Sequence, residues 1–104
     1  MRVCALVSDL MDRSKITAAN GDVVFVRDAE ACAGADVVVV DLARFGVAVV
    51  EVRAAAPAAR LVCFGPHVDD AGAAAATEAG ADVVLPRSAF FRDPASAIRP
   101  AGDL

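Results

Sequence analysis

Residues 37–41, four valines followed by an aspartate, constrain the fold of this chain more than any other segment. β-Branched side chains fill the run without any alternation of apolar and polar positions. A strand of this kind is covered on both faces, which is typical of a central strand in a parallel sheet. In open parallel sheets, binding and chemistry gather just beyond the carboxyl ends of the strands. Asp41 occupies such an end and is the first candidate functional residue.

Other short apolar runs alternate with segments that have helical spacing or helix-capping residues. The predicted strands cover residues 3–7, 23–26, 37–41, 60–64 and 81–85. Helices are predicted after the capping residues Asp9, Asp28 and Asp93, and over residues 47–56 and 71–79. Repeated strand–helix units with short connections predict a parallel sheet between two layers of helices. The fold class is therefore α/β, a three-layer sandwich whose five-stranded parallel sheet has the flavodoxin-like order 2-1-3-4-5.

The predicted helix over residues 47–56 has apolar positions at helical spacing. Val47 and Val50 belong to its apolar face, and we expect them to pack toward the sheet. Glu51 and Arg53 fall on the other face, where we expect them to meet solvent.

Length and charge limit the classes of function. At 104 residues the chain is predicted to be a single domain, 1–104, with a core that needs no disulfide or metal support. The net charge is -4 and the ten basic residues form no run, which argues against binding to nucleic acid or to an anionic membrane. No apolar stretch approaches the roughly 20 residues that span a bilayer, and no signal peptide is recognisable. We therefore expect a cytoplasmic protein.

Three segments have an arrangement that is known from other proteins. They are the valine run ending in Asp41-Leu42, the helix and proline of residues 49–57, and residues 80–82 leading into 85–87. On these segments the chain resembles the receiver domains of response regulators over essentially its whole length. In that family the aspartate after the third strand accepts a phosphoryl group from a histidine kinase or a small phosphodonor. The resemblance implies a signalling domain, not an enzyme, with Asp41 as the candidate phosphoacceptor.

The family also holds Mg²⁺ with a pair of acids after the first strand. Asp9 matches one member of that pair, and its neighbours are Ser8 and Leu10. The resemblance thus implies a Mg²⁺ site made by Asp9 and Asp41, with two carboxylates where the family usually has three. Mg²⁺ prefers oxygen ligands and retains water, so two acids would bind it weakly. Asp12 is predicted only to stabilise the positive end of its helix.

Two further positions depart from the family pattern. Gly65, followed by Pro66, stands where the family has a Ser or Thr whose hydroxyl contacts the phosphoryl group. Arg87 stands at the lysine position, with a planar fork in place of a compact ammonium. These departures favour an atypical, stand-alone pseudo-receiver that acts through protein–protein interaction. The alternative is a functional receiver in which Asp41 is phosphorylated with Mg²⁺ and Arg87 replaces the lysine.

Basic and polar residues also gather at the predicted strand ends. They are Arg13, Arg44, His67, Arg87 and Ser88. Arginine forks bind phosphate oxygens, so a small anion- or nucleotide-binding protein is a further alternative, set against a plain network of ion pairs at the rim of the sheet. For His67, a solvent-facing or capping role is favoured over metal binding. No glycine-rich loop follows the first strand, which argues against a dinucleotide site.

Phe90 and Phe91 follow the last predicted strand. In the resembling family, the face made by the fourth helix, fifth strand and fifth helix often pairs domains. The resemblance therefore implies an interface at Phe90 and Phe91, either with another protein or in a homodimer. The other explanation is that the two rings complete the core, Phe90 more so than Phe91.

Overall fold

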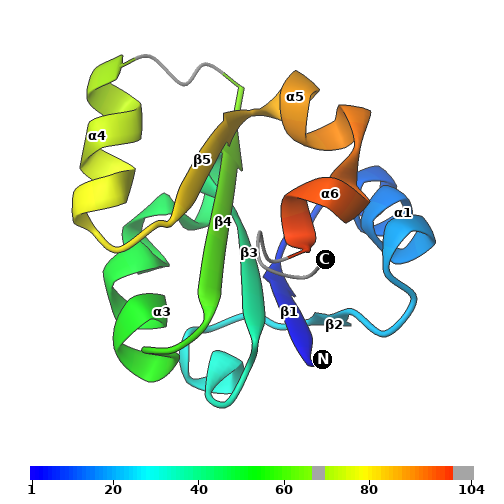
Figure 1. Cartoon of the computed structure of the whole chain (residues 1–104), viewed down its shortest axis with the longest axis horizontal. Helices are drawn as coiled ribbons and strands as arrows, with labels where there is room; N and C mark the ends of the chain where they lie inside the picture. The colour runs from blue at the N-terminus through cyan, green and yellow to red at the C-terminus, as the bar shows by residue number, and fades with distance from the viewer. Residues whose placement is uncertain (67–69, 100–104) are drawn as a thin grey trace.

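A computed structural model describes residues 1–66 and 70–99 and contains one parallel sheet of five strands (Figure 1). The strands are β1 (Val3–Leu6), β2 (Val24–Phe25), β3 (Val37–Asp41), β4 (Arg60–Gly65) and β5 (Val83–Pro86). Their order is β2-β1-β3-β4-β5, and every neighbouring pair is parallel, which confirms the predicted topology. The central strand is β3, and all of its residues are buried.

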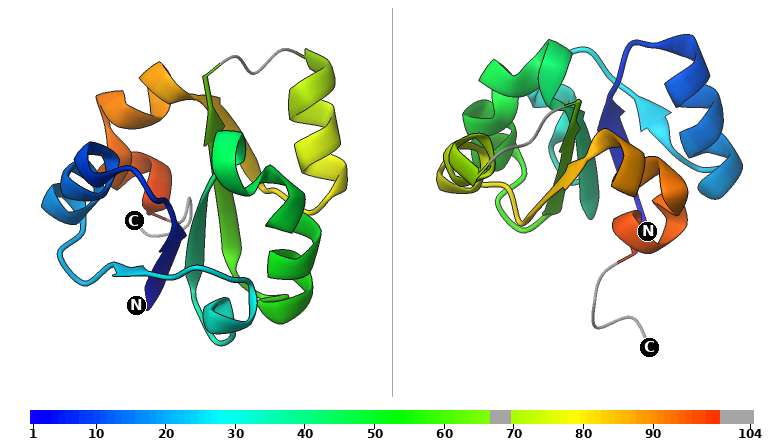
Figure 2. Two further views of the ribbon diagram at one scale, coloured as in Figure 1. Left: turned by 180° about the vertical axis from the view of Figure 1, so that it is seen from behind. Right: turned by 90° about the horizontal axis from the view of Figure 1, so that it is seen from above.

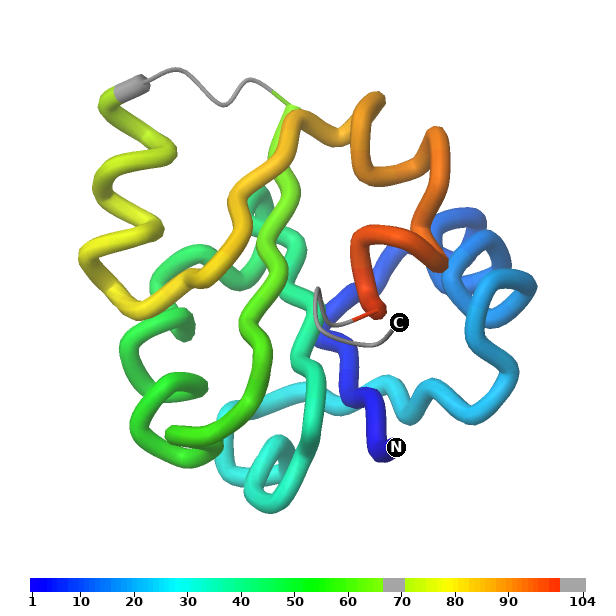
Figure 3. The backbone as a smooth tube through the Cα atoms, viewed as in Figure 1, coloured from blue at the N-terminus to red at the C-terminus, as the bar shows by residue number. Residues whose placement is uncertain are grey.

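Helical segments cover both faces of the sheet, as predicted for a three-layer sandwich (Figure 2). One face carries α1 (Leu10–Ala19), α5 (Arg87–Arg92) and α6 (Pro94–Ile98). The other carries the 3₁₀ turn η1 (Glu30–Cys32), α2 (Leu42–Phe45), the 3₁₀ turn η2 (Gly46–Ala48), α3 (Val49–Ala55) and α4 (Asp70–Glu78). The backbone trace in Figure 3 shows α1 and α4 at opposite sides of the molecule. No helix in the described ranges is long and apolar enough to cross a membrane.

The sheet divides the core into two halves, and the valine run contributes to both. Val38 and Val40 point to the half formed with η1, α3 and α4, whereas Val37 and Val39 point to the half formed with α1, α5 and α6. Successive side chains of a strand face opposite sides of the sheet, so a strand covered on both sides must be apolar at each position. This is the physical origin of the unbroken valine pattern.

The predicted helix over residues 47–56 is shorter than expected, and its buried face was wrongly predicted. Val49 and Val52 are buried, whereas Val47 is 94% exposed and Val50 62% exposed. The chain passes through α2 and the η2 turn before α3 begins at Val49, so Val47 belongs to η2 and lies outside the helix on whose spacing the prediction relied. Arg53, expected in solvent, is partly buried.

Other elements differ from the prediction in extent. The helix expected after Asp28 is only the η1 turn, in which the Ala31 N–H donates to Asp28 Oδ1 at 3.1 Å. A helix that was not predicted, α5, begins directly after β5. Two predicted helix caps are confirmed, because Asp9 caps α1 and Asp93 caps α6.

Arg53 ties α3 to the amino-terminal ends of β4 and β5. Its guanidinium donates to the Gly80 carbonyl at 2.8 and 3.0 Å, to the Ala59 carbonyl at 2.7 Å and to Asp82 Oδ2 at 2.7 Å. Gly80 has a φ of +124°, and a Cβ added there would lie 2.7 Å from the Cβ of Arg53. The close approach of the arginine stem therefore requires glycine at this position.

Candidate functional site

Asp41 lies where β3 ends and α2 begins, at the carboxyl edge of the sheet. Its residue is 5% exposed, and its Oδ1 accepts a hydrogen bond from the Ala43 N–H at 3.1 Å. Burial raises the pKa of the Asp41 carboxyl above its ordinary value. The Ala43 N–H opposes that shift, the charge of Asp12 adds to it, and the guanidinium groups of Arg87 and Arg44 oppose it.

Asp12, in the first turn of α1, is the second buried carboxylate of this edge, with 1% of its residue exposed. Both of its oxygens accept hydrogen bonds from Arg87. The guanidinium Nη1 donates to Oδ2 at 2.8 Å, and Nη2 donates to Oδ1. This bond to Asp12 raises the pKa of the Arg87 guanidinium. The ion pair joins α1 to the start of α5, 75 residues later in the sequence.

Aromatic rings support the arginine from below. The Arg87 guanidinium carbon lies 4.9 Å from the centre of the Phe91 ring and 5.9 Å from that of Phe64. Phe64 stacks on Phe90 with 4.8 Å between ring centres, and Phe91 meets both rings edge-on. Lys15 Nζ lies 5.4 Å from the centre of the Phe91 ring. The Arg87 guanidinium therefore contacts aromatic rings as well as Asp12.

Comparison by sequence finds no match, whereas comparison of structures finds proteins with the same fold. No family model matches the chain, and no curated protein matches it. A response regulator from Burkholderia pseudomallei, described with a phosphorylated aspartic acid, a calcium ion and citrate, superposes with a TM-score of 0.77 at 15% identity, covering 95% of this chain and 67% of that one. This chain has the receiver-domain fold.

Two more solved structures show the range of proteins with this fold. An orphan response regulator of H. pylori matches with a TM-score of 0.73 at 14% identity, covering 95% of this chain and 97% of that one. A putative pilus assembly protein from Sinorhizobium meliloti matches with a TM-score of 0.70 at 16% identity, covering 94% and 97%. These identities establish the receiver fold alone, so the chemistry of the site is argued from its own residues.

The receiver fold places Asp9 on the exposed surface at the start of α1, where its Oδ1 accepts the Asp12 N–H at 3.0 Å. Asp9 and Asp41 thus each use one carboxylate oxygen to cap a helix. Asp12 is already engaged by Arg87, so it does not complete a set of three acids. No group of three or more metal-ligating side chains occurs among residues 1–66 and 70–99. A Mg²⁺ site at Asp9 and Asp41 stays a prediction, with at most two carboxylates.

The remaining candidates at the strand ends differ in their relation to Asp41. Arg13 Nε donates to the Val7 carbonyl at 2.6 Å, and its guanidinium lies over the Phe25 ring, 5.0 Å from the centre. Arg44 and Ser88 are exposed. His67 lies outside the described residues. Among the predicted cations, Arg87 and Arg44 act on Asp41, and Arg13 is directed toward β2.

The two aromatic candidates are placed in the core half on the α1 side. Phe90 is completely buried and offers no surface to a partner. It therefore completes the core by stacking on Phe64 and does not form the interface expected at this residue. Phe91 is partly buried against the same cluster. An interface role for Phe91 stays a prediction.

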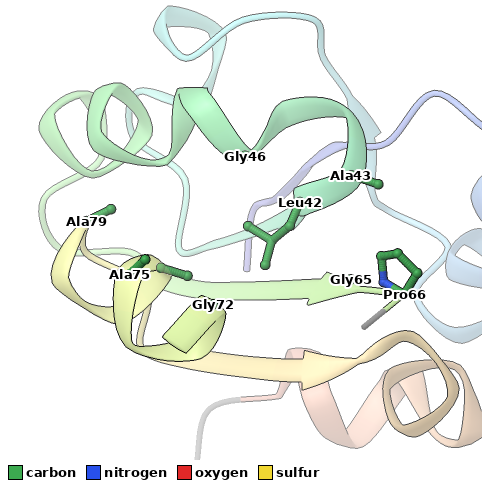
Figure 4. Close-up of a pocket in the computed structure, with 9 residues that line it drawn as sticks. Leu42, Ala43, Gly46, Gly65, Pro66, Gly72, Ala75 and Ala79 are labelled. Atoms are coloured by element: carbon green, nitrogen blue, oxygen red, sulfur yellow. The ribbon is translucent and has the colours of Figure 1, made fainter. Parts of the chain in front are cut away.

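Gly65 ends β4 next to Asp41, and the absence of a side chain there opens a groove. The groove has a volume of about 370 Å³ and lies between α2 and α4, with the Leu42 side chain projecting into it (Figure 4). Among the residues that the structure describes, its lining carries no charged side chain and consists of Leu42, Ala43, Gly46, Gly65, Pro66, Gly72, Ala75, Ala76 and Ala79. Gly65, at the position where receiver domains have a hydroxyl, and the small residues of α4 thus produce an apolar surface near Asp41.

Asp12 is the site residue that was missed from the sequence. It lies four positions before the buried Ile16, on the face of α1 that meets the sheet. An acid in line with an apolar helix face must find a partner, because a buried unpaired charge is costly. The spacing between Asp12 and Ile16 could therefore have indicated a buried ion pair. The predicted interaction of Asp12 with the positive end of its helix explained only its position in the first turn.

Proposed function

We propose that this chain is an atypical receiver domain that acts by binding another protein or a second copy of itself in the cytoplasm, without phosphotransfer as its ordinary switch. The observation that carries the proposal is the ion pair between Asp12 and Arg87. Arg87, the cation that directly follows β5, is held through both terminal nitrogens by a buried carboxylate of the same chain.

Phosphoryl transfer to a carboxylate depends on cations and donors that neutralise the charge of the transferred group. In this site Arg87 is engaged by Asp12, and Gly65 supplies no hydroxyl. The acceptor Asp41 is 5% exposed and caps α2, so its carboxylate is largely enclosed. Each feature works against phosphotransfer, and together they favour a domain whose output depends on its surface.

Exposed apolar side chains next to the site support partner binding. Leu10 and Met11 directly follow Asp9 in the first turn of α1, and they are 78% and 71% exposed. Adjacent exposed apolar side chains are typical of surfaces that bind proteins. The described fold is also that of a protein named as a putative pilus assembly protein, so in other chains it is not confined to response regulators.

The anion-binding alternative is less well supported. It requires arginines that converge on one space, but Arg13 is bonded to the Val7 carbonyl and Arg87 to Asp12. Arg44 is the remaining arginine of that set, and a single exposed guanidinium binds phosphate only weakly. We therefore retain partner binding as the proposed function.

The test is the intact mass of the chain after incubation with Mg²⁺ and acetyl phosphate, for the wild type and for Asp41→Asn. We expect no phosphoryl adduct on the wild type. An adduct that forms on the wild type and is absent from Asp41→Asn would refute the proposal and establish a functional phospho-receiver.

A further inference from the structure

We propose that Asp12 is a built-in competitor of phosphorylation: its carboxylate occupies the guanidinium of Arg87, which would otherwise bind a phosphoryl group on Asp41. The inference rests on the proposed function and deepens it, because it names the residue that keeps the phosphoacceptor silent. Asp12 is thus a positioning residue that acts on Asp41 through Arg87.

The geometry of the pair explains the competition. A guanidinium binds a carboxylate and a phosphoryl group in the same way, through two parallel N–H···O bonds. In this chain both terminal nitrogens of Arg87 donate to the two oxygens of Asp12. Asp12 therefore presents to Arg87 the pair of oxygens that a phosphoryl group would present.

Burial makes the competition one-sided. The side chain of Asp12 is 1% exposed, whereas that of Arg87 is 41% exposed. If the two separate, the arginine can be hydrated, but the aspartate is left as a buried charge without a partner. Phe91 adds to this preference, because the centre of its ring lies 4.9 Å from the guanidinium carbon of Arg87 while that group is bonded to Asp12.

The charges around Arg87 give a second reason. Asp12, Asp41 and Asp9 all act on the guanidinium, and Asp12 and Asp41 are both buried. Phosphorylation would replace the single charge of Asp41 by about two negative charges. With Asp12 present, this edge of the sheet would become more negative than one arginine can offset. Without Asp12, the same arginine would face the phosphoryl group alone.

The reaction needs a phosphodonor and Mg²⁺ from outside the chain, which acetyl phosphate with added Mg²⁺ provides. A carboxylate oxygen of Asp41 attacks the phosphorus atom and forms a new O–P bond. The bond between phosphorus and the acetyl oxygen breaks, and acetate leaves with the electron pair, so no proton is required. Once freed from Asp12, Arg87 would bind two oxygens of the transferred group.

The experiment compares the full chain in five forms by intact mass after incubation with Mg²⁺ and acetyl phosphate. Asp12→Asn removes the competing charge, Asp12→Glu retains it, and Glu51→Gln removes an exposed carboxylate from α3 as a matched control. We expect a phosphoryl adduct on Asp12→Asn, formed at least about tenfold faster than the slowest rate that the assay can detect, which the wild type does not reach. Asp12→Glu and Glu51→Gln should remain unlabelled like the wild type, and Asp41→Asn added to Asp12→Asn should abolish the adduct.

The outcomes separate this inference from the proposed function. Rapid labelling of the wild type would refute the proposed function, whereas absence of labelling in a folded Asp12→Asn chain would overturn the competition alone. A purely structural role for Asp12 would lower the melting temperature without producing an adduct. Asp12→Thr gives the same comparison if the amide variant does not fold. If neither carboxylate-free chain folds, the pair is a structural requirement and the inference is overturned.

Discussion

Gly80→Ala tests whether the tie between Arg53 and the start of β5 has the strength that its geometry implies. The backbone at Gly80 has a φ of +124°, a conformation that costs other residues about 1–3 kcal/mol. The new Cβ would also lie 2.7 Å from the Cβ and Cγ of Arg53 and displace that side chain. Losing hydrogen bonds to partly buried carbonyls adds about 1–3 kcal/mol. We therefore expect the free energy of unfolding to fall by about 2–6 kcal/mol.

The effect is large for a domain of this size and is measurable by circular dichroism. The chain contains no Trp and no Tyr, so the far-ultraviolet signal is the appropriate probe of unfolding. At about 4–8 °C per kcal/mol, the melting temperature should fall by about 10 °C or more. Gly21→Ala is the matched control, because a Cβ there meets nothing within 4 Å. That control should change stability by less than about 1 kcal/mol.

A double-mutant cycle separates the two contributions to this cost. In a chain that already carries Arg53→Ala, the hydrogen bonds of the guanidinium are absent, so Gly80→Ala should cost less by about 1 kcal/mol or more. Equal stability losses in Gly80→Ala and Gly21→Ala would refute the reasoning. The same conclusion would follow if the cost of Gly80→Ala did not change when Arg53 is removed.

Three other predictions follow from the buried groups. Arg87→Ala leaves Asp12 buried without its partner and should destabilise the chain by about 2–4 kcal/mol in urea unfolding. This is slightly below the cost of breaking a fully buried pair, because Arg87 is partly hydrated. An unchanged urea midpoint of unfolding would contradict this prediction. Burial raises the pKa of Asp41 in the folded chain, so its contribution to stability is full below the ordinary carboxyl pKa of about 3.9 and is lost as the pH rises through the raised pKa. Asp41→Asn should therefore melt at a higher temperature than the wild type at pH 7, with a difference that shrinks as the pH falls, and a lower melting temperature at pH 7 would be the contrary result. Burial raises the pKa of Cys32 to about 11 and that of Cys63 to about 12. A disulfide reagent at pH 8 should thus react with these thiols only after unfolding, and rapid reaction of the native chain would be inconsistent with their burial.

The sheet was predictable from the sequence because its signals are local and repeated. The valine run of β3 could bury its apolar side chains only between two layers of helices. The alternation of strands and helices along the chain then left few possible topologies for the sheet. The cap at Asp9 was predictable for a similar reason, since a side-chain acceptor before a helix acts within the same turn. The position of Asp41 at the carboxyl edge followed from the fold.

The features that were not predictable depend on neighbours distant in the sequence. The buried face of α3 was misassigned because the helical spacing was counted from Val47, which belongs to the η2 turn and is exposed, whereas α3 begins at Val49 and buries Val49 and Val52. The pairing of Asp12 with Arg87 spans 75 positions, so neither residue alone indicates it. Helical spacing placed Asp12 on the buried face of α1, but only the folded chain shows which cation meets it.

The small side chains that line the groove also determine how α4 is attached to the rest of the fold. Ala76 is the residue of this helix that belongs to the buried core, and Ala75 and Ala79 line the groove beside it. Helices lock against their neighbours when large side chains form ridges that fit into grooves, and methyl groups form only shallow ridges. A displacement of α4 along the sheet would therefore separate few interlocked side chains. In the part of the chain that the structure describes, α1, α3, α5 and α6 each bury a larger apolar side chain than the alanine of α4, so we expect filling of the adjoining groove to shift α4 more readily than these helices.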